Sequence, residues 1–232
     1  MGFVMNNKRV LKDIYSNLLD YYGPRGWWPG ETRIEIMVGA ILTQAVAWKN
    51  VEKSISALKN AGLLDLPKLA AIPATELAEI IHTSLYHRQK ARKIKALIQY
   101  IQDSYQGDID LMMQQPLKTL RCELLSVWGI GEETADSILL YAGNYPIFVV
   151  DAYTRRIFSR LGLTAATADY AQVQSFMHHN LKPDVSMYNE YHALLVAQGA
   201  SKCKKSKPAC NTCPISHFCK DLQYMQENHA LG

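Results

Sequence analysis

Apolar residues recur three and four positions apart along most of this chain, which is the spacing of helices that bury one face. The pattern predicts helices within residues 10–22, 34–48, 51–64, 74–86, 90–105, 117–128, 132–143, 152–163 and 188–200. Glycine and proline separate these segments, for example at Gly23-Pro24, Pro73 and Pro116. Only residues 145–153 contain a strand-like apolar run, and it is short. The sequence therefore predicts an all-α fold with short connections.

Composition limits the class of protein. Hydrophobic residues make up 48% of the 232 residues and charged residues 20%, which is typical of a globular protein with a sizeable core. No apolar run approaches the roughly 20 residues that span a bilayer, and the N-terminal residues lack the apolar stretch of a signal peptide. We therefore expect a cytoplasmic protein without a membrane partner.

Four cysteines near the C-terminus follow the spacing C-x6-C-x2-C-x5-C: Cys203, Cys210, Cys213 and Cys219. Four thiolates this close in sequence can converge on one metal centre, either zinc or an iron–sulfur cluster. Disulfides are disfavoured because nothing else in the chain suggests secretion. The fifth cysteine, Cys122, stands alone, and we expect it to be a buried small hydrophobe.

Two glycines around one apolar residue, Gly129-Ile130-Gly131, separate two predicted helices. This arrangement allows a tight hairpin whose backbone N–H groups bind a phosphate, although a simple packing corner would look the same. About twenty residues later, Asp151 follows an apolar run and opens a helix. It can be a plain N-cap, a chemically active carboxylate, or both.

Aromatic and basic residues gather in a few places. Three of the four tryptophans, Trp27, Trp28 and Trp48, surround one predicted helix, where they are either core or the lining of a pocket. Two basic clusters suit contact with an extended polyanion, unless they are merely solvated helix faces. They comprise Lys202, Lys204, Lys205 and Lys207 in the first cysteine loop, and Arg88, Lys90, Arg92, Lys93 and Lys95 further upstream.

Together, the hairpin, the aspartate and the cysteine loop resemble the endonuclease III superfamily of helix-hairpin-helix DNA glycosylases over essentially the whole chain. The resemblance implies a two-lobed all-α fold, with a six-helix lobe at residues 31–144 that ends in the hairpin. Residues 1–30 and 145–232 would form the second lobe. It also implies that Asp151 is catalytic and that a [4Fe-4S] cluster is bound by the four cysteines of the loop at residues 203–219.

Two departures separate the chain from well-known branches of this superfamily. Members with lyase activity carry a nucleophilic lysine where this chain has Glu133, and a carboxylate cannot form a Schiff base. Adenine-specific relatives carry a glutamate five residues before a glutamine. Counting back from Gln44 gives Gly39, and Glu35, one turn earlier, is not equivalent.

The early segment looks most like the endonuclease III-like 3-methyladenine DNA glycosylases. By that resemblance Trp27, Trp28, Pro29 and Trp48 line the base pocket, and Gln44 fills the gap that the extruded base leaves. Indole rings suit cationic alkylated purines because they offer stacking and cation–π attraction. The hairpin residues Gly129, Ile130 and Gly131, with Lys204, Lys205 and Lys207, would contact DNA phosphates.

The sequence thus predicts a monomeric, nucleoid-associated base excision repair glycosylase that acts on double-stranded DNA with a damaged base. Alkylated purines are the expected lesions, and no lyase step is expected. Two alternatives remain: a bifunctional glycosylase and abasic lyase for damaged pyrimidines, and a non-catalytic binder of DNA damage.

Overall fold

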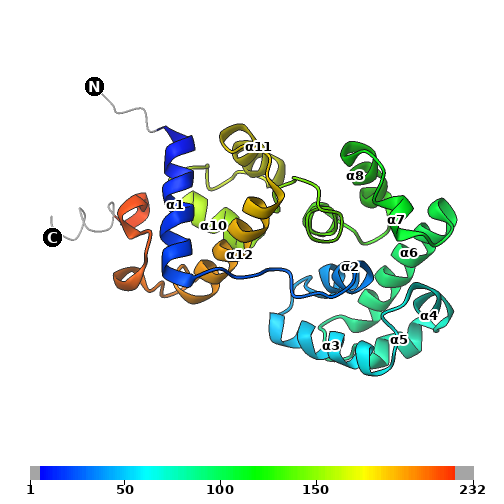
Figure 1. Cartoon of the computed structure of the whole chain (residues 1–232). Helices are drawn as coiled ribbons and strands as arrows, with labels where there is room; N and C mark the ends of the chain where they lie inside the picture. Colours follow the sequence, from blue (N-terminus) through cyan, green and yellow to red (C-terminus); the bar gives the residue numbers. More distant parts are fainter. Residues whose placement is uncertain (1–5, 223–232) are drawn as a thin grey trace. The chain divides into compact units, whose positions relative to one another are not determined.

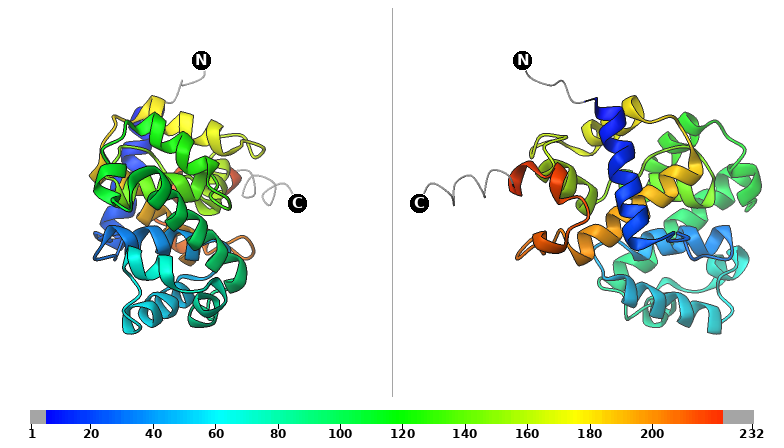
Figure 2. Two further views of the ribbon diagram at one scale, coloured as in Figure 1. Left: turned by 90° about the vertical axis from the view of Figure 1, so that its right-hand side faces the viewer. Right: turned by 60° about the vertical axis from the view of Figure 1, so that its left-hand side comes forward.

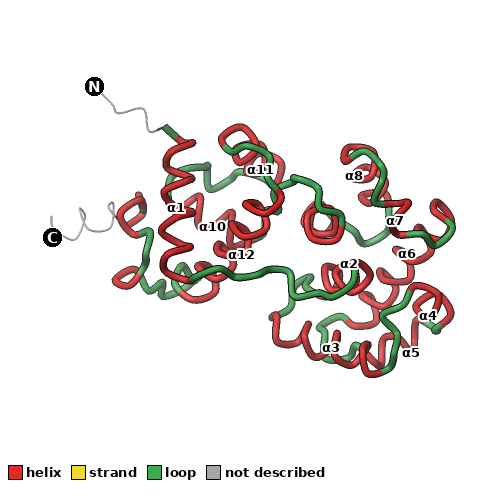
Figure 3. The backbone as a smooth tube through the Cα atoms, viewed as in Figure 1, coloured by secondary structure: helices red, strands yellow, loops and turns green. Residues whose placement is uncertain are grey.

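The structure is a computed structural model that describes residues 6–222 (Figure 1). Within these residues the regular structure is helical and no strand occurs, as the tube in Figure 3 shows. The predicted all-α class is therefore confirmed. The described residues contain no helix with both the length and the apolar character of a membrane span.

The chain divides into two compact units. Unit 1 comprises residues 1–27 and 146–232, and unit 2 comprises residues 28–145. The described helices of unit 1 are α1 (Asn7–Tyr22), α10 (Ala152–Arg160), α11 (Tyr170–Asn180) and α12 (Val185–Ser201), followed by two 3₁₀ turns, η2 (Cys210–Thr212) and η3 (Ser216–Phe218).

Unit 2 contains both the longest and the shortest α-helix of the described residues. They are α2 (Arg33–Leu42), α3 (Trp48–Asn60), α4 (Leu66–Ala71), α5 (Ala74–Ile80), α6 (His87–Tyr105), α7 (Ile109–Met112), α8 (Leu117–Ser126) and α9 (Glu132–Ser137). A π-helical turn, η1 (Ile138–Ala142), continues α9. The longest of these helices, α6, buries residues at three- and four-residue spacing, among them Ile94, Leu97, Ile98 and Ile101.

In unit 1, α12 is the central helix, because both α1 and α10 pack against it. The second view in Figure 2 shows α1, in blue, running across α12, in orange. The side chains at the contact are large and buried: Tyr191 is inaccessible to solvent, and its hydroxyl donates to the Leu11 carbonyl at 2.9 Å. The N-terminal helix is therefore fastened to the C-terminal half of the chain.

Candidate functional site

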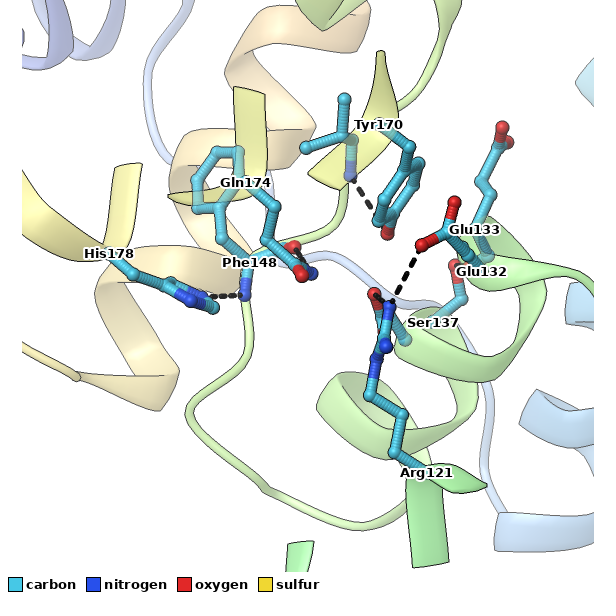
Figure 4. A network of polar contacts seen from close by, with 10 residues as sticks. Arg121, Glu132, Glu133, Ser137, Phe148, Tyr170, Gln174 and His178 are labelled. Carbon is cyan, nitrogen blue, oxygen red and sulfur yellow. Dashed lines mark hydrogen bonds and ion pairs between the residues drawn. The ribbon is translucent and has the colours of Figure 1, made fainter. Parts of the chain in front are cut away.

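The strand-like run before Asp151 is an extended segment that is bonded to a helix instead of a sheet. Residues 147–150 are buried. One face of α11 presents Tyr170, Gln174 and His178 to this segment at intervals of four residues (Figure 4). The Phe148 N–H donates to His178 Nε2 at 3.0 Å, and Gln174 Nε2 donates to the Phe148 carbonyl at 2.7 Å. The Val150 N–H donates to the Tyr170 hydroxyl at 3.3 Å. This ladder fixes the backbone that ends at Asp151.

Asp151 caps α10 and is only 8% exposed. Its Oδ1 accepts the Thr154 N–H at 2.7 Å, which is the bond of a helix N-cap. The N-terminus of a helix also stabilises a negative charge. The sequence-based interpretation of Asp151 as a cap is therefore correct, and it leaves the second carboxylate oxygen available for another interaction.

A histidine from α12 faces that second oxygen. His192 is 6% exposed, and its Nε2 lies 3.7 Å from Asp151 Oδ2. Burial lowers the pKa of His192 below its usual value, while the charge of Asp151 acts in the opposite direction with a smaller effect. Sequence reasoning missed this residue, because a histidine within a helical apolar pattern carries no signal of what lies opposite it.

In unit 2, the hairpin between α8 and α9 depends on one of its two glycines. Gly129 has φ +85°, and a Cβ there would lie 2.4 Å from Lys93 Cγ. Gly131 has an ordinary φ of −98° and open space around it. Ile130 is buried between them, whereas Trp128 just before the hairpin is 58% exposed. Close approach of backbone to the Lys93 side chain explains the first glycine but not the second.

Gln44 is bonded to this hairpin. Its Nε2 donates to Thr134 Oγ1 at 2.8 Å and to the Gly129 carbonyl at 3.2 Å. Lys93 Nζ in turn donates to Gln44 Oε1 at 2.6 Å. A cavity of about 200 Å³ adjoins this network, and its lining includes Gln44 and the exposed Glu133. The structure thus brings together Gln44, the hairpin and the position where lyases carry lysine.

The aromatic residues of unit 2 form a corner of rings. Trp28 and Trp48 meet edge to face, with ring centroids 5.2 Å apart and an interplanar angle of 90°. Tyr141 lies 5.2 Å from Trp28 at 43°. A Cβ at Gly39 would come within 2.9 Å of Trp28 Cζ2, so the missing side chain at this position makes room for the indole. As placed, the two indoles form adjoining walls and not two parallel plates.

Two further residues of the predicted pocket are Trp27 and Pro29. Trp27 is half-buried and ends the first segment of unit 1, whereas Trp28 opens unit 2. Pro29 is exposed. Glu35 is not equivalent to the catalytic glutamate of adenine-specific relatives. It is buried, and its Oε1 pairs with Lys59 Nζ at 2.9 Å.

Two exposed apolar side chains, Leu85 and Tyr86, lie immediately before α6 and are 53% and 61% exposed. Tyr86 has a left-handed backbone with φ 59°, which turns the chain into the helix. Large apolar side chains at an exposed turn can act as wedges between bases. An apolar pair directly before a basic helix is the signal in the sequence from which these two residues could have been predicted.

Lys90 ties this turn to the end of α2. Its amine is buried and donates at 2.8 Å both to Ser84 Oγ and to the Leu42 carbonyl, two residues before Gln44. Burial, with a smaller effect of Lys93, lowers the pKa of Lys90 to about 8. Lys95 also points inward, since its amine donates to backbone carbonyls at the end of α4. The predicted basic face at residues 88–95 is therefore wrong for these two lysines.

The four C-terminal cysteines line one cavity of about 260 Å³ in unit 1. Gln198 Nε2 lies 3.1 Å from Cys213 Sγ and Arg160 Nη1 lies 3.3 Å from Cys203 Sγ, both as donors. Burial raises the pKa of the Cys213 and Cys219 thiols. Among residues 6–222, no three histidine, cysteine, aspartate or glutamate side chains are grouped closely enough for a single metal ion.

The loop around these cysteines exposes Lys204, Lys205 and Lys207. Arg160 anchors the loop, because its guanidinium donates to the carbonyls of Lys204 and Lys205 at 2.8 and 3.2 Å. Cys122, by contrast, is exposed on α8, so the prediction that it is buried is wrong.

The sequence and the fold both match known proteins. A family model described as the HhH-GPD superfamily base excision DNA repair protein matches residues 38–183. A candidate DNA repair glycosylase of Methanocaldococcus jannaschii is 45% identical and covers 92% of this chain and 97% of its own. An endonuclease III of Synechocystis is 27% identical over 92% of this chain and 90% of its own.

Two solved structures are also similar. One is an H. pylori 3-methyladenine DNA glycosylase bound to 1,N6-ethenoadenine. It superposes with a TM-score of 0.72 at 30% identity, and the match covers 83% of this chain and 96% of that one. A non-covalent endonuclease III–DNA complex has a TM-score of 0.81 at 21% identity and covers 95% and 98%. The second likeness concerns the fold alone.

We predict that the two hairpin glycines differ in their tolerance of a side chain. Gly129→Ala should destabilise the protein by roughly 1 kcal/mol or more and weaken binding to duplex DNA, because it strains the backbone and displaces Lys93. Gly131→Ala is the matched control for stability and should leave the melting temperature nearly unchanged, because a Cβ there meets no atom within 4 Å. Thermal unfolding and DNA titrations check this, and equal losses of stability in the two variants would contradict it.

Proposed function

The chain belongs to the HhH-GPD superfamily of base excision DNA repair proteins, and on that premise we propose that it is a monofunctional DNA glycosylase for alkylated purines. The observation that carries the proposal is the carboxylate of Asp151. It is buried at a helix N-terminus, with one oxygen in the cap and the other facing an imidazole. A buried carboxylate in this position can stabilise the positive charge that develops on the sugar as the base leaves.

The chemistry needs little more than this carboxylate. A purine alkylated at N3 or N7 carries a positive charge and leaves as a neutral base, so no acid has to protonate it. Loss of the base leaves an oxocarbenium-like sugar, whose charge Asp151 stabilises while it orients or deprotonates the attacking water. Only one carboxylate is required, in contrast to the pair used by most glycosidases.

The damaged base is recognised by the aromatic corner of Trp28, Trp48 and Tyr141. A cationic, planar base stacks on an indole face and gains cation–π attraction of roughly 0.5–2 kcal/mol per contact. Because the two indoles adjoin at 90°, the base stacks on one ring and meets the edge of the other, unless one ring turns. The glycosylase similar to this chain that was solved with ethenoadenine supports a purine substrate.

DNA is held by backbone and positive charge. The hairpin at residues 129–131 and the exposed Lys204, Lys205 and Lys207 bind phosphates without regard to sequence. Gln44 fills the space left by the extruded base, and Leu85 wedges the neighbouring base pairs. Solved DNA complexes of the same fold support this use of the scaffold.

The cysteine loop carries a [4Fe-4S] cluster. The fit rests on four thiols around one cavity, larger than a single ion requires, with two further donors aimed at the sulfurs. The bound cluster supplies a rigid cross-link for the loop. Arg160 and Gln198 stabilise the thiolates as donors, and Arg160 also holds the carbonyls of Lys204 and Lys205.

The function is tested by single-turnover release of bases from duplexes that carry 3-methyladenine, 7-methylguanine or oxidised pyrimidines. We expect release of the alkylated purines only. Strands should break only after alkali, and borohydride should trap no adduct, because Glu133 replaces the lysine nucleophile. Trp48→Ala should slow release about ten- to a hundredfold yet retain affinity for abasic DNA, since stacking contributes roughly 1–3 kcal/mol per base.

Release of oxidised pyrimidines with a trapped adduct would instead indicate a bifunctional enzyme. It would direct attention to Lys93, whose amine lies beside Gln44.

Asp151→Asn should keep DNA binding but lose base release by about 10²-fold or more, because it removes the charge that stabilises the sugar cation. Asp184→Asn is the matched control: Asp184 caps α12 in the same way, since its carboxylate accepts the Met187 N–H at 2.8 Å, but Asp184 is exposed. Equal rates of base release for the Asp151 variant and the wild type would show that Asp151 serves only as a helix cap.

For the cofactor, we expect brown protein with about four iron atoms and four acid-labile sulfides per chain. Cys219→Ser should lose the visible absorbance and lower the yield of folded protein, because metal binding is coupled to folding of the loop. Cys122→Ser, which changes a cysteine outside the cavity, should not. Stoichiometric zinc without sulfide would contradict the assignment.

A further inference from the structure

Asp151 differs from every other aspartate that caps a helix in residues 6–222. The structure contains five such caps, and the other four are exposed: Asp65, Asp108, Asp169 and Asp184. All five accept a backbone N–H from the first turn of the helix. Capping therefore requires neither burial nor a histidine, and both features of Asp151 call for another explanation.

His192 is placed to interact with the part of Asp151 that the cap does not use. Oδ1 is taken by the Thr154 N–H, and Oδ2 is the oxygen that lies 3.7 Å from His192 Nε2. The two residues come from α10 and α12, which pack together within unit 1. This separation is longer than a hydrogen bond, so the imidazole has to move closer to Oδ2 to donate to it. An apolar residue at position 192 would leave Oδ2 desolvated without compensation, which is costly for a charged group.

The charge state of the imidazole determines what it does to Asp151. Burial favours the neutral form of His192. A neutral imidazole can donate Nε2–H to Oδ2 and leave the full negative charge on the carboxylate. An imidazolium would form an ion pair and diminish the field that the carboxylate exerts on a developing cation. Burial and geometry together thus give an aspartate that is oriented but not neutralised.

We propose that His192 is a positioning residue for Asp151, whose Nε2–H holds the carboxylate in the orientation from which it stabilises the sugar cation. This inference rests on the proposed glycosylase function. It assigns His192 no contact with DNA and no covalent role. It predicts that the rate of base release depends on a donor at the position of Nε2, while the affinity for DNA does not.

The test compares three substitutions of His192 in the full-length protein, with single-turnover release of 3-methyladenine and titration with abasic duplex as the two measurements. Glutamine places an amide N–H near the position of Nε2, asparagine places it nearer Nδ1, and leucine has no donor. We expect release to fall about ten- to a hundredfold with leucine and asparagine, as for loss of a hydrogen bond to a charged group. Glutamine should restore most of the rate, and abasic affinity should stay constant throughout.

Tyr188→Phe is the matched control for burial. Tyr188 lies one turn earlier on α12, is inaccessible to solvent, and its hydroxyl makes no hydrogen bond among the described residues. This variant should release bases at the wild-type rate. Melting temperatures are measured for every variant, and if the leucine variant does not fold, the comparison of glutamine with asparagine still decides.

Equal rates for the glutamine and asparagine variants, or a leucine variant as fast as the wild type, would overturn the role of His192. If Asp151→Asn is inactive in the same experiment, the proposed function stands despite that result. If Asp151→Asn retains the wild-type rate, it is the proposed function that fails.

Discussion

The position of the candidate catalytic carboxylate depends on how one buried, extended segment satisfies its backbone hydrogen bonds. Residues 147–150 are apolar and shielded from water, and the described residues offer no strand beside them. A buried N–H or carbonyl left unsatisfied costs roughly 1–3 kcal/mol. The side chains of Tyr170, Gln174 and His178 on α11 accept or donate these bonds instead. The backbone that leads to Asp151 is thus positioned by a helix that contributes no group to the proposed chemistry.

Much of the fold was accessible from the sequence because it is local. The three- and four-residue spacing of apolar positions predicts the helices, and their packing within each unit follows from the buried faces. The same holds for Asp151 as a cap, since a cap needs only the next turn of its own helix. The four cysteines are close in sequence, so their gathering around one cavity required little information from elsewhere in the chain.

What the sequence did not reveal are contacts between distant segments. His192 lies on a helix that is remote in sequence from Asp151, and its own pattern is that of an ordinary core residue. Lys90 belongs to a run of cationic residues whose pattern suggests a solvated helix face. Its amine nevertheless donates hydrogen bonds to buried groups within unit 2. Trp28 and Trp48 meet edge to face, and Trp28 fits there because Gly39 has no side chain to exclude the indole.

In the absence of DNA, the Gln44 side chain already makes three hydrogen bonds within the protein. Its amide holds Thr134 and the Gly129 carbonyl, and it receives the amine of Lys93. In the proposed glycosylase, insertion of this side chain into a duplex would require all three bonds to be exchanged for bonds to DNA or water. The exchange would be easier at a weakened base pair than in intact duplex, where the base pairs resist opening. For the proposed function, the resting hydrogen bonds of Gln44 thus add an energetic cost that undamaged DNA would have to overcome.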